Sequence, residues 1–278
     1  MYEAFYGLKE KPFSILPDPD LIYWGRMHSM AFTMLEFGVL NNAGFTVITG
    51  EIGSGKTTLV RHLLRMLSPN LTMALISNSP QGREELLQWI LMALGQPFDG
   101  NYAGLFKQLQ DFLYSQYAAG RRTLLILDEA QNLEVEALEH LRMLSNINAD
   151  KYQILQLILV GQPQLRDLLL NPKLRQFAQR ISSDFHLKPL SEAEVAKYID
   201  FRLRAVGATD QLFTAAACAE IAWASGGIPR MINILSDTAL VYGFAGSHRS
   251  ISEALVREVI ADKQQFSIFP IQKPLQSC

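Results

Sequence analysis

A glycine-rich stretch, GEIGSGKTT at residues 50–58, carries one lysine and two threonines directly after an apolar run. Glycines let the backbone turn its N–H groups inward around phosphate oxygens, and the positive end of a following helix adds to that field. The spacing G-x-x-x-x-G-K-[ST] predicts that Lys56 reaches the β and γ phosphates and that Thr57 offers its hydroxyl to Mg²⁺. The alternative is a glycine-rich turn without a ligand. The predicted nucleotide-binding residues are Gly50, Glu51, Ile52, Gly53, Ser54, Gly55, Lys56, Thr57 and Thr58.

Two adjacent carboxylates, Asp128 and Glu129, end a second apolar run at residues 123–127. An acid at the carboxyl end of a parallel strand faces the crevice in which ligands bind. We therefore predict that Asp128 holds Mg²⁺ and that Glu129 orients and polarises the attacking water. This pair indicates hydrolysis of ATP in addition to binding. The alternative is that both carboxylates cap the helix that follows.

The elements that must position these residues follow from the hydrophobic pattern. Five short apolar runs predict strands at residues 45–49, 72–77, 123–127, 154–160 and 184–187. Amphipathic helices are predicted between them, at residues 84–94, 105–117 and 134–146. This alternation predicts an α/β fold with a parallel five-stranded sheet between helices.

After Pro189 the pattern predicts helices only, at residues 191–206, 214–225, 228–243 and 252–262. SEAE at residues 191–194 has the spacing of a capping box, which starts the first of these helices. The start of the chain is rich in proline and aromatic residues, which predicts an arm that covers the sheet or contacts a nucleotide base. The predicted domains are an arm at 1–30, an α/β domain at 31–188, a small all-helical lid domain at 189–264 and a tail at 265–278.

Composition excludes several classes of protein. A net charge of -2 over 278 residues gives no overall attraction to nucleic acid. Two cysteines exclude a disulfide framework. No apolar run approaches the ~18 residues of a membrane span. We expect a cytoplasmic protein that associates with a membrane peripherally, if at all.

The chain resembles the AAA+ ATPases, which are P-loop NTPases. Within them it is similar to the bacterial secretion ATPases typified by ExeA, the general secretion pathway protein A group. The resemblance rests on FYGLKEKPFSILPDPDLIYWG, GFTVITGEIGSGKTTLVRHLL, LLILDEAQNL, LRMLSN, LILVGQPQL and ASGGIPRMIN. It points to the shorter members, which are encoded at PEP-CTERM/exosortase exopolysaccharide loci or serve MSHA pilus assembly and lack the membrane helix and peptidoglycan-binding domain of ExeA.

The resemblance implies roles for further residues. Gln162 occupies the position of the polar sensor, where Asn, Thr or Ser is more usual. Arg180 matches the arginine finger that acts in trans within a homo-oligomer, with Arg175 as a second candidate. Arg230 matches the sensor arginine of the lid. Tyr23 and His28 are expected to border adenine, although His28 could equally be a surface helix residue, and each arginine could instead make a surface ion pair.

Three functions follow from these inferences. The first is a Mg²⁺-dependent ATPase that remodels an envelope secretion or exopolysaccharide export complex at the inner membrane. The second is a DNA-binding AAA+ regulator of the MuB/TniB or initiator type. The third is an ATP-gated scaffold with little turnover.

Overall fold

The computed structural model describes residues 1–16, 18, 21–66, 71–77, 80, 82–149 and 152–266. The chain divides into two compact units. The sheet unit comprises Ser29–Gly50 and Leu59–Leu187. The helical unit comprises Met1–His28, Glu51–Thr58 and the chain from Lys188 onward. The glycine-rich loop is thus grouped with the helical unit, although it directly follows a strand of the sheet.

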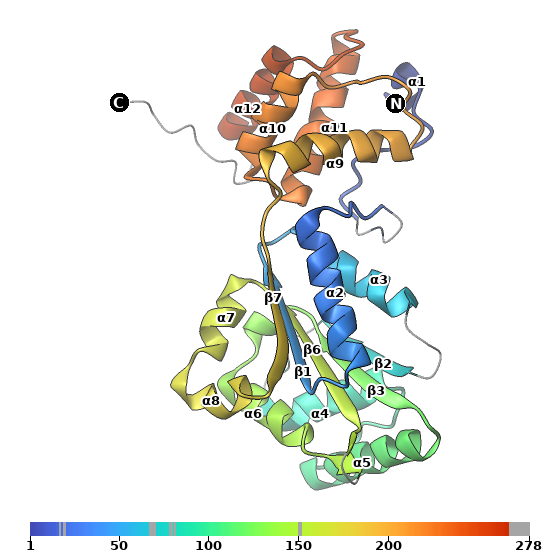
Figure 1. Cartoon of the computed structure of the whole chain (residues 1–278), viewed down its shortest axis with the longest axis vertical. Helices are drawn as coiled ribbons and strands as arrows, with labels where there is room; N and C mark the ends of the chain where they lie inside the picture. The colour runs from blue at the N-terminus through green and yellow to red at the C-terminus, as the bar shows by residue number, and fades with distance from the viewer. Residues whose placement is uncertain are drawn as a thin grey trace. The chain divides into compact units, whose positions relative to one another are not determined.

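The sheet unit contains the parallel five-stranded sheet that the sequence predicts (Figure 1). Its strands, in spatial order, are β2 (Leu71–Ile76), β3 (Arg122–Leu127), β6 (Leu155–Gly161), β1 (Phe45–Gly50) and β7 (Ile181–Leu187). Both β1 and β3 pair with β6 in parallel, with Thr49 beside Gly161 and Leu127 beside Leu159. The carboxyl ends of these three central strands therefore meet at one edge of the sheet.

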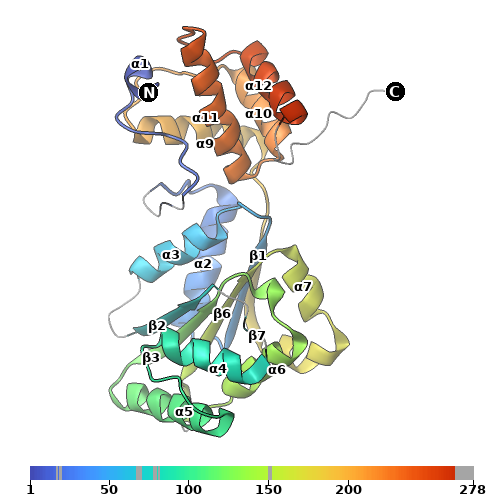
Figure 2. The ribbon, with the colours of Figure 1, turned by 180° about the vertical axis from the view of Figure 1, so that it is seen from behind.

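Side chains alternate between the two faces of the sheet, as the pleat requires. Phe45 and Val47 of β1 join the main apolar core on the face covered by α4 (Gly82–Ala93), α5 (Tyr102–Ala118), α6 (Val135–Leu144) and α7 (Pro163–Leu169) (Figure 2). On the other face lie α2 (Arg26–Leu40) and α3 (Lys56–Met66). Gly38 of α2 approaches β1 so closely that a Cβ would lie 2.2 Å from Thr46 Oγ1.

Short elements complete the sheet unit. They are the 3₁₀ turns η1 (Ala130–Asn132) and η2 (Pro172–Leu174), the small antiparallel pair β4 (Asn148–Ala149) and β5 (Tyr152–Gln153), and α8 (Arg175–Ala178). The turn η1 follows β3 directly, and α8 precedes β7. The turn η1 contains Gln131, and the helix α8 contains Arg175.

The helical unit consists of α1 (Glu3–Tyr6), α9 (Glu192–Ala205), α10 (Ala215–Ser225), α11 (Pro229–Ala245) and α12 (Glu253–Phe266). The capping box at the start of α9 is confirmed, because Ser191 and Glu194 each bond the other's backbone N–H. Helix α12 runs through Phe266, two residues beyond the predicted end of the lid domain at residue 264. The rest of the predicted tail lies outside the described residues. No helix in the described ranges is long and apolar enough to span a membrane.

The N-terminal arm is part of the core of the helical unit. Tyr2, Tyr6, Leu8 and Phe13 are buried there among apolar side chains of α9 to α12. Tyr6 Oη donates to the carbonyl of His248 at 3.0 Å, which fixes the arm on the end of α11. The expectation that the arm covers the sheet is wrong for these residues, because aromatic content predicts burial without naming the partner surface.

Candidate functional site

The loop between β1 and α3 has the backbone shape of a phosphate cradle. Gly53 and Gly55 have φ of +80° and +99°, in a region that side chains other than glycine enter at a cost. Ser54 N–H donates to the carbonyl of Glu51 at 3.1 Å and closes the turn. Helix α3 begins at Lys56, so its positive end lies directly behind the loop.

Lys56 and Ser54 give this loop its polar interior. Lys56 is only 8% exposed, and its Nζ donates to the carbonyl of Glu51 at 2.9 Å. The Ser54 hydroxyl is buried without a hydrogen-bond partner among the described residues. A buried hydroxyl without a partner is costly unless a ligand completes it, and a lysine ammonium attracts phosphate oxygens. The loop therefore fits a phosphate group, and the neighbouring Thr57 hydroxyl suits Mg²⁺.

Arg230 lies against the loop through its backbone. It occupies the first turn of α11, and its N–H donates to the carbonyl of Gly53 at 3.2 Å. A Cβ on Gly53 would lie only 2.4 Å from Arg230 Cβ, so any side chain at position 53 would force the two segments apart. The predicted lid arginine and the phosphate loop are thus brought together within the helical unit.

His28 also supports the loop. Its Nε2 lies 3.0 Å from the carbonyl of Ser54, and a Cβ on Gly55 would be 3.2 Å from the same nitrogen. A carbonyl only accepts, so Nε2 carries the proton. At 7% exposure His28 is not a surface helix residue, and that interpretation is wrong. Burial lowers the pKa of its imidazole, partly opposed by the bond to Ser54 and by the charge of Glu194.

The segment before His28 is held by helix α9. Glu194 accepts from Ser191 N–H at 3.0 Å and from the backbone of Arg26, and these bonds lower the pKa of its carboxyl despite the opposing effect of burial. Tyr23 packs edge-on against the ring of Tyr198, with centroids 5.8 Å apart. Tyr23 is therefore an aromatic residue at the rim of the helical core.

In the sheet unit, Asp128 and Glu129 form the turn at the end of β3. Asp128 N–H donates to the carbonyl of Ile76 at 2.8 Å and extends the pairing of β3 with β2 by one bond. Asp128 Oδ1 accepts from Glu129 N–H at 2.9 Å. Glu129 itself has φ of +53°, which is unusual for a residue with a side chain and is typical of functional turns.

Glutamine amides bind the Glu129 carboxylate. Glu129 Oε2 accepts from Gln131 Nε2 at 2.7 Å and from Gln162 Nε2 at 3.2 Å. Gln162 comes directly after β6 and caps α7, so the parallel pairing of β3 with β6 brings it beside Glu129. Sequence reasoning missed Gln131. The sequence feature that could have identified it is an amide side chain two residues after the predicted catalytic carboxylate.

The two candidate arginine fingers lie elsewhere in the sheet unit. Arg180 is half-buried, and its Nη1 donates to Ser145 Oγ at 3.0 Å. Arg175 starts α8 and is exposed. Arg180 precedes the amino end of β7, whereas Glu129 follows the carboxyl end of β3, so a strand length of ~20 Å separates the two edges. Arg180 and Glu129 therefore lie at opposite edges of the sheet.

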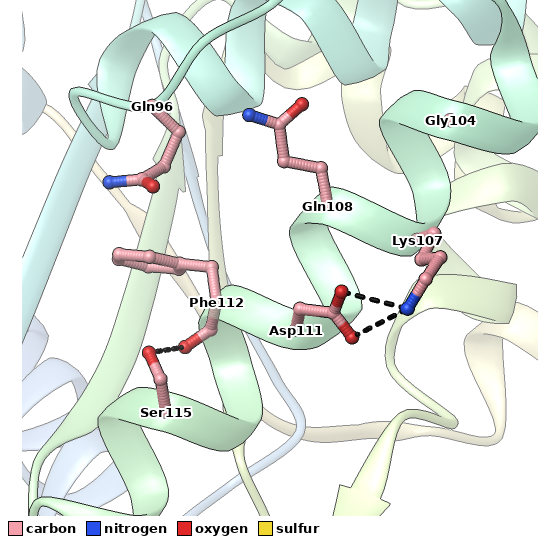
Figure 3. Close-up of a pocket in the computed structure, with 7 residues that line it drawn as sticks. All are labelled: Gln96, Gly104, Lys107, Gln108, Asp111, Phe112 and Ser115. Atoms are coloured by element: carbon pink, nitrogen blue, oxygen red, sulfur yellow. Dashed lines mark hydrogen bonds and ion pairs between the residues drawn. The ribbon is translucent and has the colours of Figure 1, made fainter.

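A separate open hollow of about 430 Å³ lies on α5, and none of the predicted site residues lines it (Figure 3). Its lining residues are Gln96, Gly104, Lys107, Gln108, Asp111, Phe112 and Ser115. Lys107 is paired with Asp111 at 2.9 Å, and neither is among the predicted site residues. The described ranges also contain no group of three or more His, Cys, Asp or Glu that could hold a metal. Mg²⁺ on nucleotide phosphates needs only one or two carboxylates.

Comparison with known proteins agrees with this geometry. Residues 40–169 match the family model described as an AAA domain. The ORC2 protein of Aeropyrum pernix superposes with a TM-score of 0.69 at 21% identity, covering 94% of this chain and 73% of that one. The chain has the AAA-type P-loop NTPase fold. Cdc6p of Pyrobaculum aerophilum shares this fold, with a TM-score of 0.66 at 17% identity over 88% of this chain and 71% of that one.

A third solved structure and one curated protein extend the comparison. RuvB of Thermotoga maritima has a TM-score of 0.54 at 19% identity over 89% of this chain and 73% of that one. General secretion pathway protein A of Aeromonas hydrophila is 42% identical over 255 residues, which are 90% of this chain and 46% of that protein. The chain thus spans about half the length of this curated relative.

Proposed function

We propose that this AAA-type protein is a Mg²⁺-dependent ATPase that hydrolyses ATP to ADP and phosphate. The observation that carries the proposal is the Glu129 carboxylate, which is exposed, held by two amide donors and placed at the strand edge from which the glycine-rich loop departs. A carboxylate so held accepts a hydrogen bond from water and orients it for attack. A carboxylate that only capped a helix would not need two amide donors to hold it in place.

The remaining residues take complementary roles in this proposal. The loop N–H groups and Lys56 bind the phosphates, and Thr57 and Asp128 bind Mg²⁺. That ion, when bound, neutralises charge on the phosphate oxygens. Gln162 senses the γ-phosphate, and Arg230 does so from the lid. Tyr23 borders adenine, while His28 supports the loop.

A Glu129→Gln variant separates turnover from binding. We expect it to keep its affinity for ATP and to lose about 10²-fold or more in phosphate release, because the amide cannot act as a base. Glu134→Gln is the matched control, since Glu134 is an exposed carboxylate nearby that caps α6 without a side-chain bond. Equal rates in the wild type and Glu129→Gln would favour the ATP-gated scaffold.

We further propose that hydrolysis requires a homo-oligomer in which Arg180 of one subunit serves a neighbour, with Arg175 as the alternative. An added cation on the transferred phosphoryl group is worth about 10³-fold or more. Mixing Arg180→Ala with Glu129→Gln should restore part of the activity, because each variant supplies what the other lacks. A rate per subunit that does not depend on protein concentration, with no restoration on mixing, would exclude action in trans.

The biological role proposed is assembly or remodelling of an envelope secretion complex at the cytoplasmic side of the inner membrane. Its support is the similarity to general secretion pathway protein A. An exopolysaccharide-export or MSHA-pilus role is the narrower form of this proposal. Complementation of a deletion strain by wild type but not by Lys56→Ala, scored as exported polymer, tests it. Stimulation of the ATPase by DNA in a salt-dependent manner would favour the DNA-binding regulator.

A further inference from the structure

The side chain of Gln131 bonds both the Glu129 carboxylate and the backbone of Gln162. Its Nε2 donates to Glu129 Oε2 at 2.7 Å, and its Oε1 accepts from Gln162 N–H at 2.9 Å. Chemistry fixes the orientation of this amide, because a carboxylate only accepts and a backbone N–H only donates. The amide nitrogen therefore bonds the turn after β3, and the amide oxygen bonds the start of α7.

Glycine at position 161 leaves room for the Gln131 amide. A Cβ on Gly161, the last residue of β6, would lie 2.9 Å from Gln131 Oε1 and 2.8 Å from Leu165 Cδ2. Glu129 adopts its positive φ of +53° at a cost of about 1–3 kcal/mol for a residue with a side chain. Strain of this kind persists only where surrounding contacts enforce it. Gln131 makes the shortest of the contacts to the Glu129 carboxylate.

We propose that Gln131 is a positioning residue for ATP hydrolysis, which holds the Glu129 carboxylate by one oxygen and couples it to Gln162. The inference rests on the proposed ATPase function. Among the described residues, Glu129 Oε1 makes no hydrogen bond, so the bond to Oε2 orients the remaining oxygen toward water. Because one amide bonds both Glu129 and the backbone of Gln162, a movement of the α7 N-terminus is transmitted to the carboxylate.

The glutamine is specific for this role, and glutamate is the substitution that tests it. Glu at position 131 has nearly the same shape and can still accept from Gln162 N–H. It cannot donate to Glu129, and its charge lies beside a second carboxylate. Gln131→Glu should therefore lower kcat with little change in ATP affinity, because the bond to Gln162 N–H is kept while the donor to Glu129 is lost. A merely structural residue would tolerate a substitution of nearly the same shape.

The experiment measures kcat, ATP affinity and melting temperature for Gln131→Ala, Gln131→Met and Gln131→Glu. We expect kcat to fall about 10-fold or more in all three, while ATP affinity changes less than about threefold. Met keeps the length of the side chain and guards against collapse of the turn in the Ala variant. Gln108→Ala on α5 is the matched control, because Gln108 lines the open hollow and makes no side-chain hydrogen bond to the residues that the structure describes (Figure 3).

A second measurement tests the coupling. If Gln131 links Glu129 to Gln162, the double variant Gln131→Ala/Gln162→Ala should lose less kcat than the product of the two single losses. Unchanged kcat in the three Gln131 variants, with Glu129→Gln inactive, would overturn this inference and leave the ATPase proposal intact. A wild type that binds ATP but shows no turnover would overturn both.

Discussion

The glycine-rich loop and the Glu129 turn each hold a polar group on a backbone with positive φ, but they are supported in different ways. The loop is held through its main chain, by Arg230 N–H on Gly53 and the His28 ring on Ser54. The carboxylate of Glu129 is held through side-chain amides of Gln131 and Gln162. A main-chain support fixes the position of several N–H groups at once, as phosphate binding requires. Side-chain support orients a single carboxylate.

Substitutions at the two sites should therefore have different effects. Substitutions at the loop should abolish ATP binding, because its N–H groups bind the phosphates together. Changes at the turn should reduce turnover in graded steps and leave ATP affinity almost intact. The following predictions test this contrast, beginning with the largest expected effect.

Lys56→Ala should have the largest effect on binding. Loss of a buried ammonium from phosphate recognition costs at least about 2 kcal/mol, or about 30-fold in affinity. Isothermal titration with Mg²⁺-ATP measures the affinity. Lys107→Ala is the control, because Lys107 is an exposed lysine that forms an ion pair with Asp111. An affinity loss as large in Glu129→Gln as in Lys56→Ala would contradict the contrast.

Gly53→Ala should come next, and Gly82→Ala is a close control. The two glycines have φ of +80° and +82°, so an alanine at either position costs about 1–2 kcal/mol of backbone strain. Only Gly53 has a neighbour, because a Cβ at Gly82 meets nothing within 4 Å. We expect Gly53→Ala to lose about 10-fold or more in ATP affinity. Equal behaviour of the two variants by titration and thermal melting would show that the Arg230 contact is unimportant.

His28→Ala should weaken the loop less. The bond to Ser54 is worth about 1 kcal/mol, so ATP affinity should fall about fivefold. His28→Gln places an amide N–H near the position of Nε2 and should recover part of that loss. The same titration measures both variants. If Gln behaves like Ala, the hydrogen bond is not the source of the effect.

The smallest effect concerns pH. The pKa of His28 is lowered by burial, and that of His140 is lowered by burial and by the charge of Arg83. The unfolded chain therefore binds more protons than the folded chain below the ordinary pKa near 6.5, so stability rises with pH through this window and is lost as pH falls. Urea unfolding at pH 7.5 and 5.5 measures the difference. His28→Gln should reduce this difference in unfolding free energy between the two pH values. An unchanged difference would show that other groups cause it.

The local sequence pattern was enough to predict several elements of this protein. The five strands were predicted because continuous apolar runs need burial on both faces of a parallel sheet. The glycine-rich loop was predicted because its glycines and lysine have one spacing that suits phosphate. The capping box of α9 was predicted because Ser191 and Glu194 act over a single turn. Each of these depends on residues close together in the chain.

Only the tertiary structure decided the contacts between distant segments. Residues 129, 131 and 162 meet because β3 and β6 pair in parallel, a relation that composition does not encode. His28 bonds the loop at Ser54, and Tyr2 and Phe13 lie in the helical core, where the N-terminal arm packs with helices α9 to α12. Burial of an aromatic side chain is predictable from its chemistry, but its partner depends on long-range packing, which the local sequence does not encode.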